Sequence, residues 1–177
     1  MLEQPPVSIT QIPADFGRWG DVLALIMHAF AFMDDIIDPP SSAHLLTVEA
    51  LRAKALRETG FLALDGDRIV GCVFALEKAE GLYVGKLAVA PDRQGQGIGR
   101  RLMQAAEDLA RSRGKADIEL ETRIELAANH AAFARLGFRE TERTAHEGYD
   151  RPTSITMRKT IRKLRFMRAG AWKVFRS

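Results

Sequence analysis

Cysteine is nearly absent from this 177-residue chain, because Cys72 is the only one. A single cysteine excludes an internal disulfide, and we expect a protein of the reducing cytoplasm. Long apolar runs are also missing, so we expect no transmembrane helix. The first residues, MLEQPPVSIT, lack the basic and then apolar layout of a secretory signal. Because no His, Cys or Asp grouping has metal-ligand spacing, we expect no metal cofactor.

Acidic residues are missing from the C-terminal end. From Arg158 onward the chain has eight basic residues and no acid, which leaves 18 basic against 23 acidic residues in the remainder. The net charge of +3 therefore combines a mildly acidic body with a basic end. We expect one domain over residues 1–159 and a basic, amphipathic tail over 160–177. Such a tail would lie on the acidic body, a partner subunit, an anionic membrane or RNA.

The hydrophobic pattern alternates between strand and helix periods along the chain. It predicts strands near 7–12, 81–91, 116–123, 138–144 and 153–159, and a hairpin within 61–77 that turns at Asp65-Gly66. Helices are predicted from a cap at Asp21, from Thr47 to Gly60, from Ile98 to Gly114, and over 127–136. This order predicts a mixed sheet with helices on both faces.

The phosphate-binding fingerprints of nucleotide-binding folds are absent, although one stretch is rich in glycine. In VAPDRQGQGIGRRL (89–102), a proline ends a strand-like segment, and Gly95, Gly97 and Gly99 precede a helical pattern. The spacing fits neither G-x-G-x-x-G nor G-x-x-x-x-G-K-[ST]. Glycine permits a close approach to the backbone, and the first N–H groups of a helix lack intrahelical partners. The stretch therefore predicts a site for a phosphate or diphosphate.

Two segments carry a family resemblance. LAVAPDRQGQGIGRRLMQAAEDLA (87–110) resembles the acetyl-CoA-binding motif of the GNAT superfamily of N-acetyltransferases, reading Gln94-x-x-Gly97-x-Gly99. LETRIELAANHAAFARLGF (120–138) resembles the fifth strand and following helix of that family, with their L-G-F ending. The resemblance implies a mixed α/β (α+β) fold with a mostly antiparallel sheet of six to seven strands and about four helices on its two faces.

The resemblance also implies acetyl-CoA as co-substrate. Backbone N–H groups of residues 95–100 would bind its diphosphate, and the backbone of residues 87–89 would pair with its pantetheine arm as a further strand. Asn129, one helical turn before Phe133, would contact the cofactor, with a plain exposed position as the alternative. Phe133 stands where many relatives have a tyrosine that protonates the leaving thiolate, so the thiolate leaves unassisted or another group serves. The cofactor-binding residues expected in this way are Leu87, Ala88, Val89, Gln94, Gly95, Gln96, Gly97, Ile98, Gly99, Arg100, Asn129 and Phe133.

An amine acceptor must lose a proton before it attacks a thioester. Glu80, before the motif strand, is one candidate for the base, with a solvated turn residue as the alternative. His146 and Tyr149 lie in HEGYDRPTS (146–154), opposite the acceptor loop of this family, with a plain polar hairpin as the alternative. These three are the expected catalytic residues.

Four carboxylates would suit a cationic acceptor. Asp34, Asp35 and Asp38 lie on the loop after the first helix, although such aspartates are also common in turns. Glu121 shares a strand face with Glu119, so one of the two would approach the cleft.

The sequence thus predicts acetyl transfer from acetyl-CoA to a primary amine of an unidentified small molecule or peptide. The expected partners are a coenzyme A thioester and an amine, and a homodimer stays open. One alternative is a catalytically weak acyl-CoA-binding module, which Phe133 favours. A third reading, association with RNA or membrane through the tail, rests on composition alone.

Overall fold

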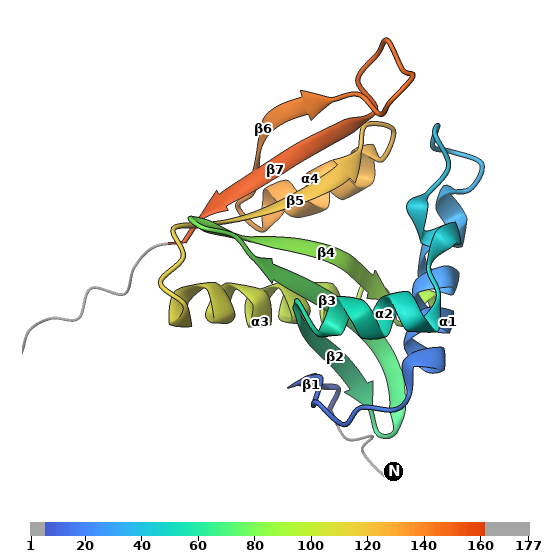
Figure 1. Cartoon of the computed structure of the whole chain (residues 1–177), viewed down its shortest axis with the longest axis vertical. Coiled ribbons are helices and arrows are strands. Elements are labelled where there is room, and N and C mark those ends of the chain that lie inside the picture. Colours follow the sequence, from blue (N-terminus) through green and yellow to red (C-terminus); the bar gives the residue numbers. More distant parts are fainter. Residues whose placement is uncertain (1–5, 162–177) are drawn as a thin grey trace, which may run out of the picture.

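Seven strands form one sheet in the computed structural model, which describes residues 6–161 (Figure 1). Only β4 and β5 are parallel neighbours among these strands, and the other five pairings are antiparallel. The expected mostly antiparallel sheet is confirmed. In sheet order the strands are β1 (Ser8–Gln11), β2 (Thr59–Asp65), β3 (Arg68–Glu77), β4 (Gly81–Val89), β5 (Asp117–Arg123), β7 (Ser154–Thr160) and β6 (Arg139–Thr144).

Four α-helices accompany the sheet within the described residues: α1 (Trp19–Phe30), α2 (Val48–Ala55), α3 (Ile98–Ser112) and α4 (Ala127–Arg135). Three short 3₁₀ turns, η1 (Ala31–Met33), η2 (Ser42–Leu45) and η3 (Pro91–Arg93), lie in the connections. On β3, a Cβ built on Gly71 would contact side chains of α3. Phe74 lies three residues further along the same strand, and its ring is covered by Lys54 of α2. Helices α3 and α2 therefore cover opposite faces of the sheet.

Two expectations about helix ends are wrong. Asp21 does not cap α1, whose N-cap is Arg18, and its carboxylate instead accepts from Arg18 Nε at 2.7 Å. Gly60 does not end α2, because that helix stops at Ala55 and Gly60 lies inside β2. A Cβ on Gly60 would lie 2.6 Å from Ile12 Cδ1, so the glycine allows the chain before α1 to pack against β2.

The sheet opens in its middle. β4 and β5 pair only from Gly81–Val84 to the four residues 117–120, after which no pairing joins them. The register of β3 against β4 also shifts between Cys72 and Phe74, which marks a bulge in β4. Lys86 lies in the bulged stretch with φ of 52°, a conformation uncommon for a residue with a side chain. The second half of β4 therefore has a free edge toward β5, as Figure 1 shows.

The described chain ends on a buried residue. β7 runs one residue past the expected domain boundary at 159, and Ile161 is buried in the core while its N–H donates to Ala116 O at 2.8 Å. The rest of the expected basic tail lies outside the described residues. Over residues 6–161, no helix combines the length and apolar character needed to cross a membrane.

Candidate active site

Two cavities meet at the opening between β4 and β5. The larger cavity measures about 640 Å³, and the second, about 350 Å³, lies against the glycine turn. Both are in the size range of small-molecule sites, roughly 300–1,000 Å³. Five residues line both cavities and mark their junction: Phe30, Met33, Leu87, Asn129 and Phe133.

The glycine-turn cavity has the geometry that a diphosphate needs. Gly95 and Gly97 have φ of 74° and 78°, and a Cβ built on either would meet no atom within 4 Å. Within residues 6–161, the N–H groups of the six residues 95–100 donate to no protein acceptor. They open onto the N-terminus of α3, where the helix dipole favours an anion. The turn is therefore a candidate site for a diphosphate.

Most of the expected cofactor residues line this cavity. They are Leu87, Ala88, Val89, Gln94, Gly95, Gly97, Ile98, Gly99, Arg100, Asn129 and Phe133, whereas Gln96 is exposed outside it. Arg93 also borders the cavity but pairs with Asp65. Arg100 is exposed at the rim, and no carboxylate of the described chain pairs with it. It is therefore the better placed of the two arginines to meet a phosphate.

Helix α4 supplies an aromatic wall instead of a proton donor. The Phe133 ring packs edge-on against Phe138, with ring centroids 6.0 Å apart. Asn129, one turn earlier, is half-buried at the junction. A hydroxyl is thus missing from α4 at the junction, as the sequence had indicated.

The larger cavity joins apolar walls to ionisable groups. Phe30, Met33, Ile37 and Leu45 provide apolar surface. The ionisable side chains that line it are His44, Lys54, Tyr83, Lys86, Glu121, Arg123 and His146.

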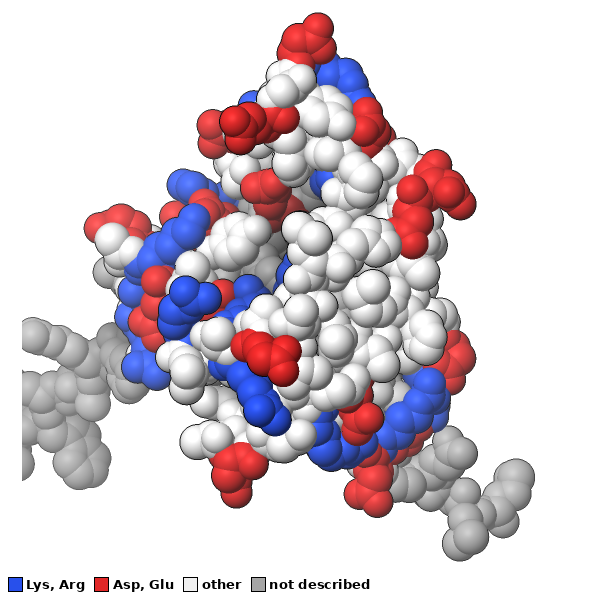
Figure 2. Space-filling view, turned by 45° about the vertical axis from the view of Figure 1, so that its right-hand side comes forward, with Lys and Arg blue, Asp and Glu red and all other residues white. Residues whose placement is uncertain are grey.

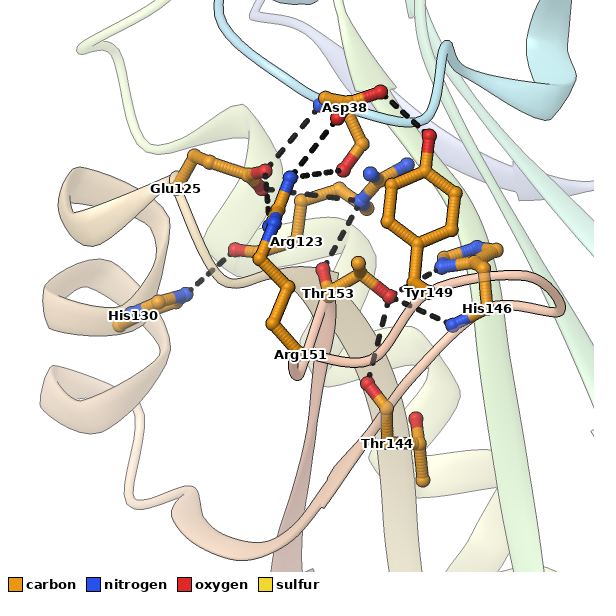
Figure 3. A network of polar contacts seen from close by, with 9 residues as sticks. All are labelled: Asp38, Arg123, Glu125, His130, Thr144, His146, Tyr149, Arg151 and Thr153. Carbon is orange, nitrogen blue, oxygen red and sulfur yellow. Dashed lines mark hydrogen bonds and ion pairs between the residues drawn. The ribbon is translucent and has the colours of Figure 1, made fainter.

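His146 is held by a buried threonine (Figure 3). Its Nδ1 lies 2.6 Å from Thr153 Oγ1, and its backbone N–H donates to the same oxygen at 2.9 Å. Thr153 is fully buried, and its hydroxyl lies 3.5 Å from the carbonyl oxygen of Thr144. The imidazole is thereby fixed on one side while the residue borders the larger cavity.

Four side chains join the loop after α1 to the β6–β7 connection and the end of β5 (Figure 3); we call them the loop bridge. Tyr149 Oη donates to Asp38 Oδ1 at 2.6 Å, and Arg151 donates to Asp38 Oδ2 at 3.0 Å. Glu125 accepts from the Asp38 N–H at 3.3 Å and lies 3.8 Å from Arg151. The hydrogen bond to Asp38 raises the pKa of Tyr149, so its phenol keeps its proton.

The other predicted site residues lie away from the cavities. Asp34 Oδ1 lies 2.7 Å from Nε2 of His44, and Asp35 is exposed beside it. Glu80 is exposed on the turn before β4. Of the expected catalytic and acceptor residues, the larger cavity brings together only His146 and Glu121.

Three cavity residues on β4 and α2 escaped the sequence analysis. Burial raises the pKa of Tyr83, and burial and then the charge of Lys54 lower the pKa of Lys86. The signal for Lys86 is its position as the one charged residue in the apolar strand GLYVGKLAV. Lys54 carried no comparable signal, because it reads as a solvated residue on a short helix.

The molecular surface around the site is unevenly charged. Figure 2 shows a broad uncharged area on one face, with acidic and basic side chains gathered along its margins. Large apolar side chains exposed in the described chain are Phe32, Ile36, Leu45 and Leu56. No group of three or more His, Cys, Asp or Glu side chains within residues 6–161 is arranged to hold a metal ion.

The known sequences to which this chain is similar are those of acetyltransferases. The model of the acetyltransferase (GNAT) family matches residues 26–138. An IAA acetyltransferase from Azospirillum brasilense is 32% identical over 142 residues, which cover 79% of this chain and 90% of that protein. N-alpha-acetyltransferase 30 from Schizosaccharomyces pombe is 37% identical over 86 residues, 46% of this chain. This match spans only 57% of the yeast protein.

Solved structures share the fold. The ribosomal-protein-S18-alanine N-acetyltransferase from Escherichia coli superposes with a TM-score of 0.70 at 23% identity, covering 96% of this chain and 99% of that one. The PaiA N-acetyltransferase from Thermoplasma acidophilum, solved in complex with coenzyme A, gives a TM-score of 0.73 at 14% identity. That match covers 88% of this chain and 99% of the other. At these identities the likeness concerns the fold alone.

Proposed function

Because this chain belongs to the GNAT family of acetyltransferases, we propose that it transfers an acetyl group from acetyl-CoA to a primary amine of a small molecule or peptide. One observation carries the proposal: a cavity with free backbone N–H groups meets a cavity with ionisable side chains at five shared residues. A donor held in the first would present its acyl end to an acceptor held in the second.

The first part of the proposed mechanism is the binding of acetyl-CoA. The N–H groups of residues 95–100 bind the diphosphate, and Arg100 adds charge at the rim. The free edge of β4 at residues 87–89 offers hydrogen bonds to the amide-bearing pantetheine arm. When bound, acetyl-CoA supplies the activated acyl group as a thioester. Backbone N–H groups at the β4 bulge lie next to the junction and suit a developing oxyanion.

His146 is the base that the geometry supports among the three candidates. His146 acts as the base in the tautomer in which Nδ1 donates to Thr153 Oγ1 at 2.6 Å, because Nε2 then keeps its lone pair for the acceptor amine. Glu80 lies on an exposed turn and Tyr149 donates to Asp38, so neither has comparable support.

The leaving group needs no acid from α4. Phe133 cannot donate a proton, and a thiol of ordinary pKa near 8.5 makes a tolerable leaving group as the thiolate. The apolar contact of Phe133 and Phe138 instead keeps water away from the junction.

Three further parts of the proposal rest on the sequence. We propose one catalytic domain that includes Thr160 and the buried Ile161, two residues past the boundary expected from the sequence, followed by a basic tail. The single buried cysteine supports a cytoplasmic location. A coenzyme A thioester and an amine are the proposed partners.

A direct assay tests the function. The protein is mixed with acetyl-CoA and a panel of primary amines, and free thiol is followed with time. We expect thiol release and one acetylated amine per thiol for at least one acceptor. Tight acetyl-CoA binding without thiol release for any amine would instead support the catalytically silent module.

A further inference from the structure

Lys86 is a cation of the larger cavity without an anionic partner. It lines the cavity from the β4 bulge and is half-buried. Within residues 6–161, no carboxylate lies within 4.0 Å of its ammonium, although 17 other ion pairs are formed there. A desolvated ammonium gains stability when an anion joins it, so this position favours a negatively charged group of a ligand.

The neighbouring Lys and Arg side chains each have a carboxylate partner, although Arg123 Nη2 is buried without a hydrogen-bond partner. Lys54 Nζ lies 2.7 Å from Glu58, and Arg123 Nε lies 3.9 Å from Glu125 while donating to Thr153 O at 3.2 Å. Burial first, and then the charge of Lys54, lowers the pKa of Lys86, whereas the charge of Glu58, which pairs with Lys54, raises it. An anion next to Lys86 would relieve that repulsion.

Glu121 is the counterpart of opposite charge. It is the one carboxylate that lines the larger cavity, it is exposed there, and it forms no ion pair within the described chain. By contrast, Asp38 already uses both carboxylate oxygens in the loop bridge. Among the Lys, Arg and Glu side chains that line the cavity, Lys86 and Glu121 are the two that form no ion pair within the described chain.

We infer that the acceptor is a small zwitterionic amine with an anionic group, such as a carboxylate, which Lys86 binds while Glu121 receives the ammonium. This inference rests on the proposed acetyl transfer and names its substrate class. The apolar wall of Phe30, Met33 and Ile37 would contact the body of such a molecule. An amine without an anion leaves the Lys86 charge desolvated and unpaired, so it binds less well.

Matched acceptors test the inference on the full chain. L-phenylalanine and L-phenylalaninamide, and 4-(aminomethyl)benzoate and 4-methylbenzylamine, are compared by kcat/KM in the wild type and in Lys86→Met. The acid-to-neutral ratio is compared between proteins, because this cancels the different pKa values of the amines. We expect Lys86→Met to lower the ratio about tenfold or more for the pair that the wild type prefers.

Two variants control for charge and strain. Lys86→Arg keeps the cation and the left-handed backbone position, so the acid preference is retained. Arg52→Gln removes one positive charge from the exposed face of α2, outside the cavity, and leaves the ratio unchanged. If Lys86→Met leaves the acid-to-neutral ratio of the wild type unchanged, the inference is wrong while acetyl transfer stands.

A binding measurement keeps the inference testable without turnover. Calorimetry of N-acetyl-L-phenylalanine and of its amide, each with the coenzyme A-loaded protein, should show a Lys86-dependent preference for the acid. That preference weakens with added salt, because the two charges are partly exposed to solvent. No acetylation of any amine alongside a Lys86-dependent acid preference would refute the proposed function but keep the anion site. Equal binding of acid and amide would refute the anion site.

Discussion

The phenol of Tyr149 donates to Asp38 Oδ1 at 2.6 Å, although 111 residues separate them in the chain. The bond holds the loop after α1 against the β6–β7 connection, and each loop also supplies residues to the larger cavity. Asp38 therefore shapes the wall of the site and does not face the acceptor. Figure 3 shows Arg151 and Glu125 completing the same bridge.

Removal of that bond should loosen the loops. We expect Tyr149→Phe to raise the KM for the amine a fewfold with a smaller change in kcat, because a single solvent-exposed hydrogen bond stabilises the loop only modestly. Amide hydrogen exchange over residues 33–46 should speed up in the same variant. An unchanged exchange rate would mean that other contacts hold the loop. A large fall in kcat with normal loop exchange would instead restore Tyr149 as a catalytic residue.

A charged substitution in the glycine turn tests the proposed diphosphate site. We expect Gly97→Glu to abolish detectable coenzyme A binding while the fold stays largely intact, because the carboxylate would stand in the diphosphate site. Gly97→Ala is the matched control, since it adds the same left-handed backbone strain of about 1–2 kcal/mol without a charge. Calorimetric titration and thermal unfolding measure the two effects. Equal coenzyme A affinity in Gly97→Glu and wild type would be incompatible with the proposed site.

The proposed base has a kinetic signature. We expect His146→Gln to lower kcat/KM for the amine about 10²-fold or more, with unchanged acetyl-CoA affinity. Glu80→Gln, on the exposed turn, should have little effect. Thr153→Val should lower the rate by less than His146→Gln and alter the pH profile, because the imidazole loses the partner that fixes its tautomer. Loss of activity in Glu80→Gln but not in His146→Gln would reverse the assignment.

The half-buried Glu119 on β5 predicts a pH dependence of stability. Hydrogen bonds from Lys78 and, less strongly, from Arg158 hold the pKa of Glu119 below its usual value near 4.5. The unfolded chain therefore takes up a proton before the native one, so this stabilisation is present above about pH 5 and is lost as the pH falls. We expect Glu119→Gln to lower the free energy of unfolding at pH 7 by about 1 kcal/mol.

Denaturant unfolding at several pH values checks this expectation. The difference in the free energy of unfolding between wild type and Glu119→Gln should decrease as the pH is lowered through the range in which carboxyl groups titrate. Glu140→Gln on the exposed edge strand β6 serves as the control and should have a smaller effect, because the Glu140 side chain is 41% exposed and that of Glu119 only 13%. If this difference in the free energy of unfolding does not depend on pH, the lost stability comes from packing and not from charge.

Local sequence patterns predicted most of the helices and strands. Thr47 accepts from the Ala50 N–H as an N-cap should, the Asp65-Gly66 turn joins β2 to β3, and Gly137 ends α4 with φ of 94°. The prediction at Gly60 was wrong because the sequence alone does not distinguish a glycine that ends a helix from a glycine that lets a strand pack closely against a neighbour. Only the packing of Ile12 against β2 tells them apart.

The amino-acid sequence by itself determined the glycine turn, the order of the strands and helices, and the family, because these depend on residues close together in the chain. The tertiary structure alone decided which side chains share a cavity. Asp38 and Tyr149 paired with each other, while Lys86, Glu121 and His146 came together from β4, β5 and the β6–β7 connection. Such placement depends on where β4 and β5 separate, and no local pattern encodes a distance between residues so far apart in the sequence.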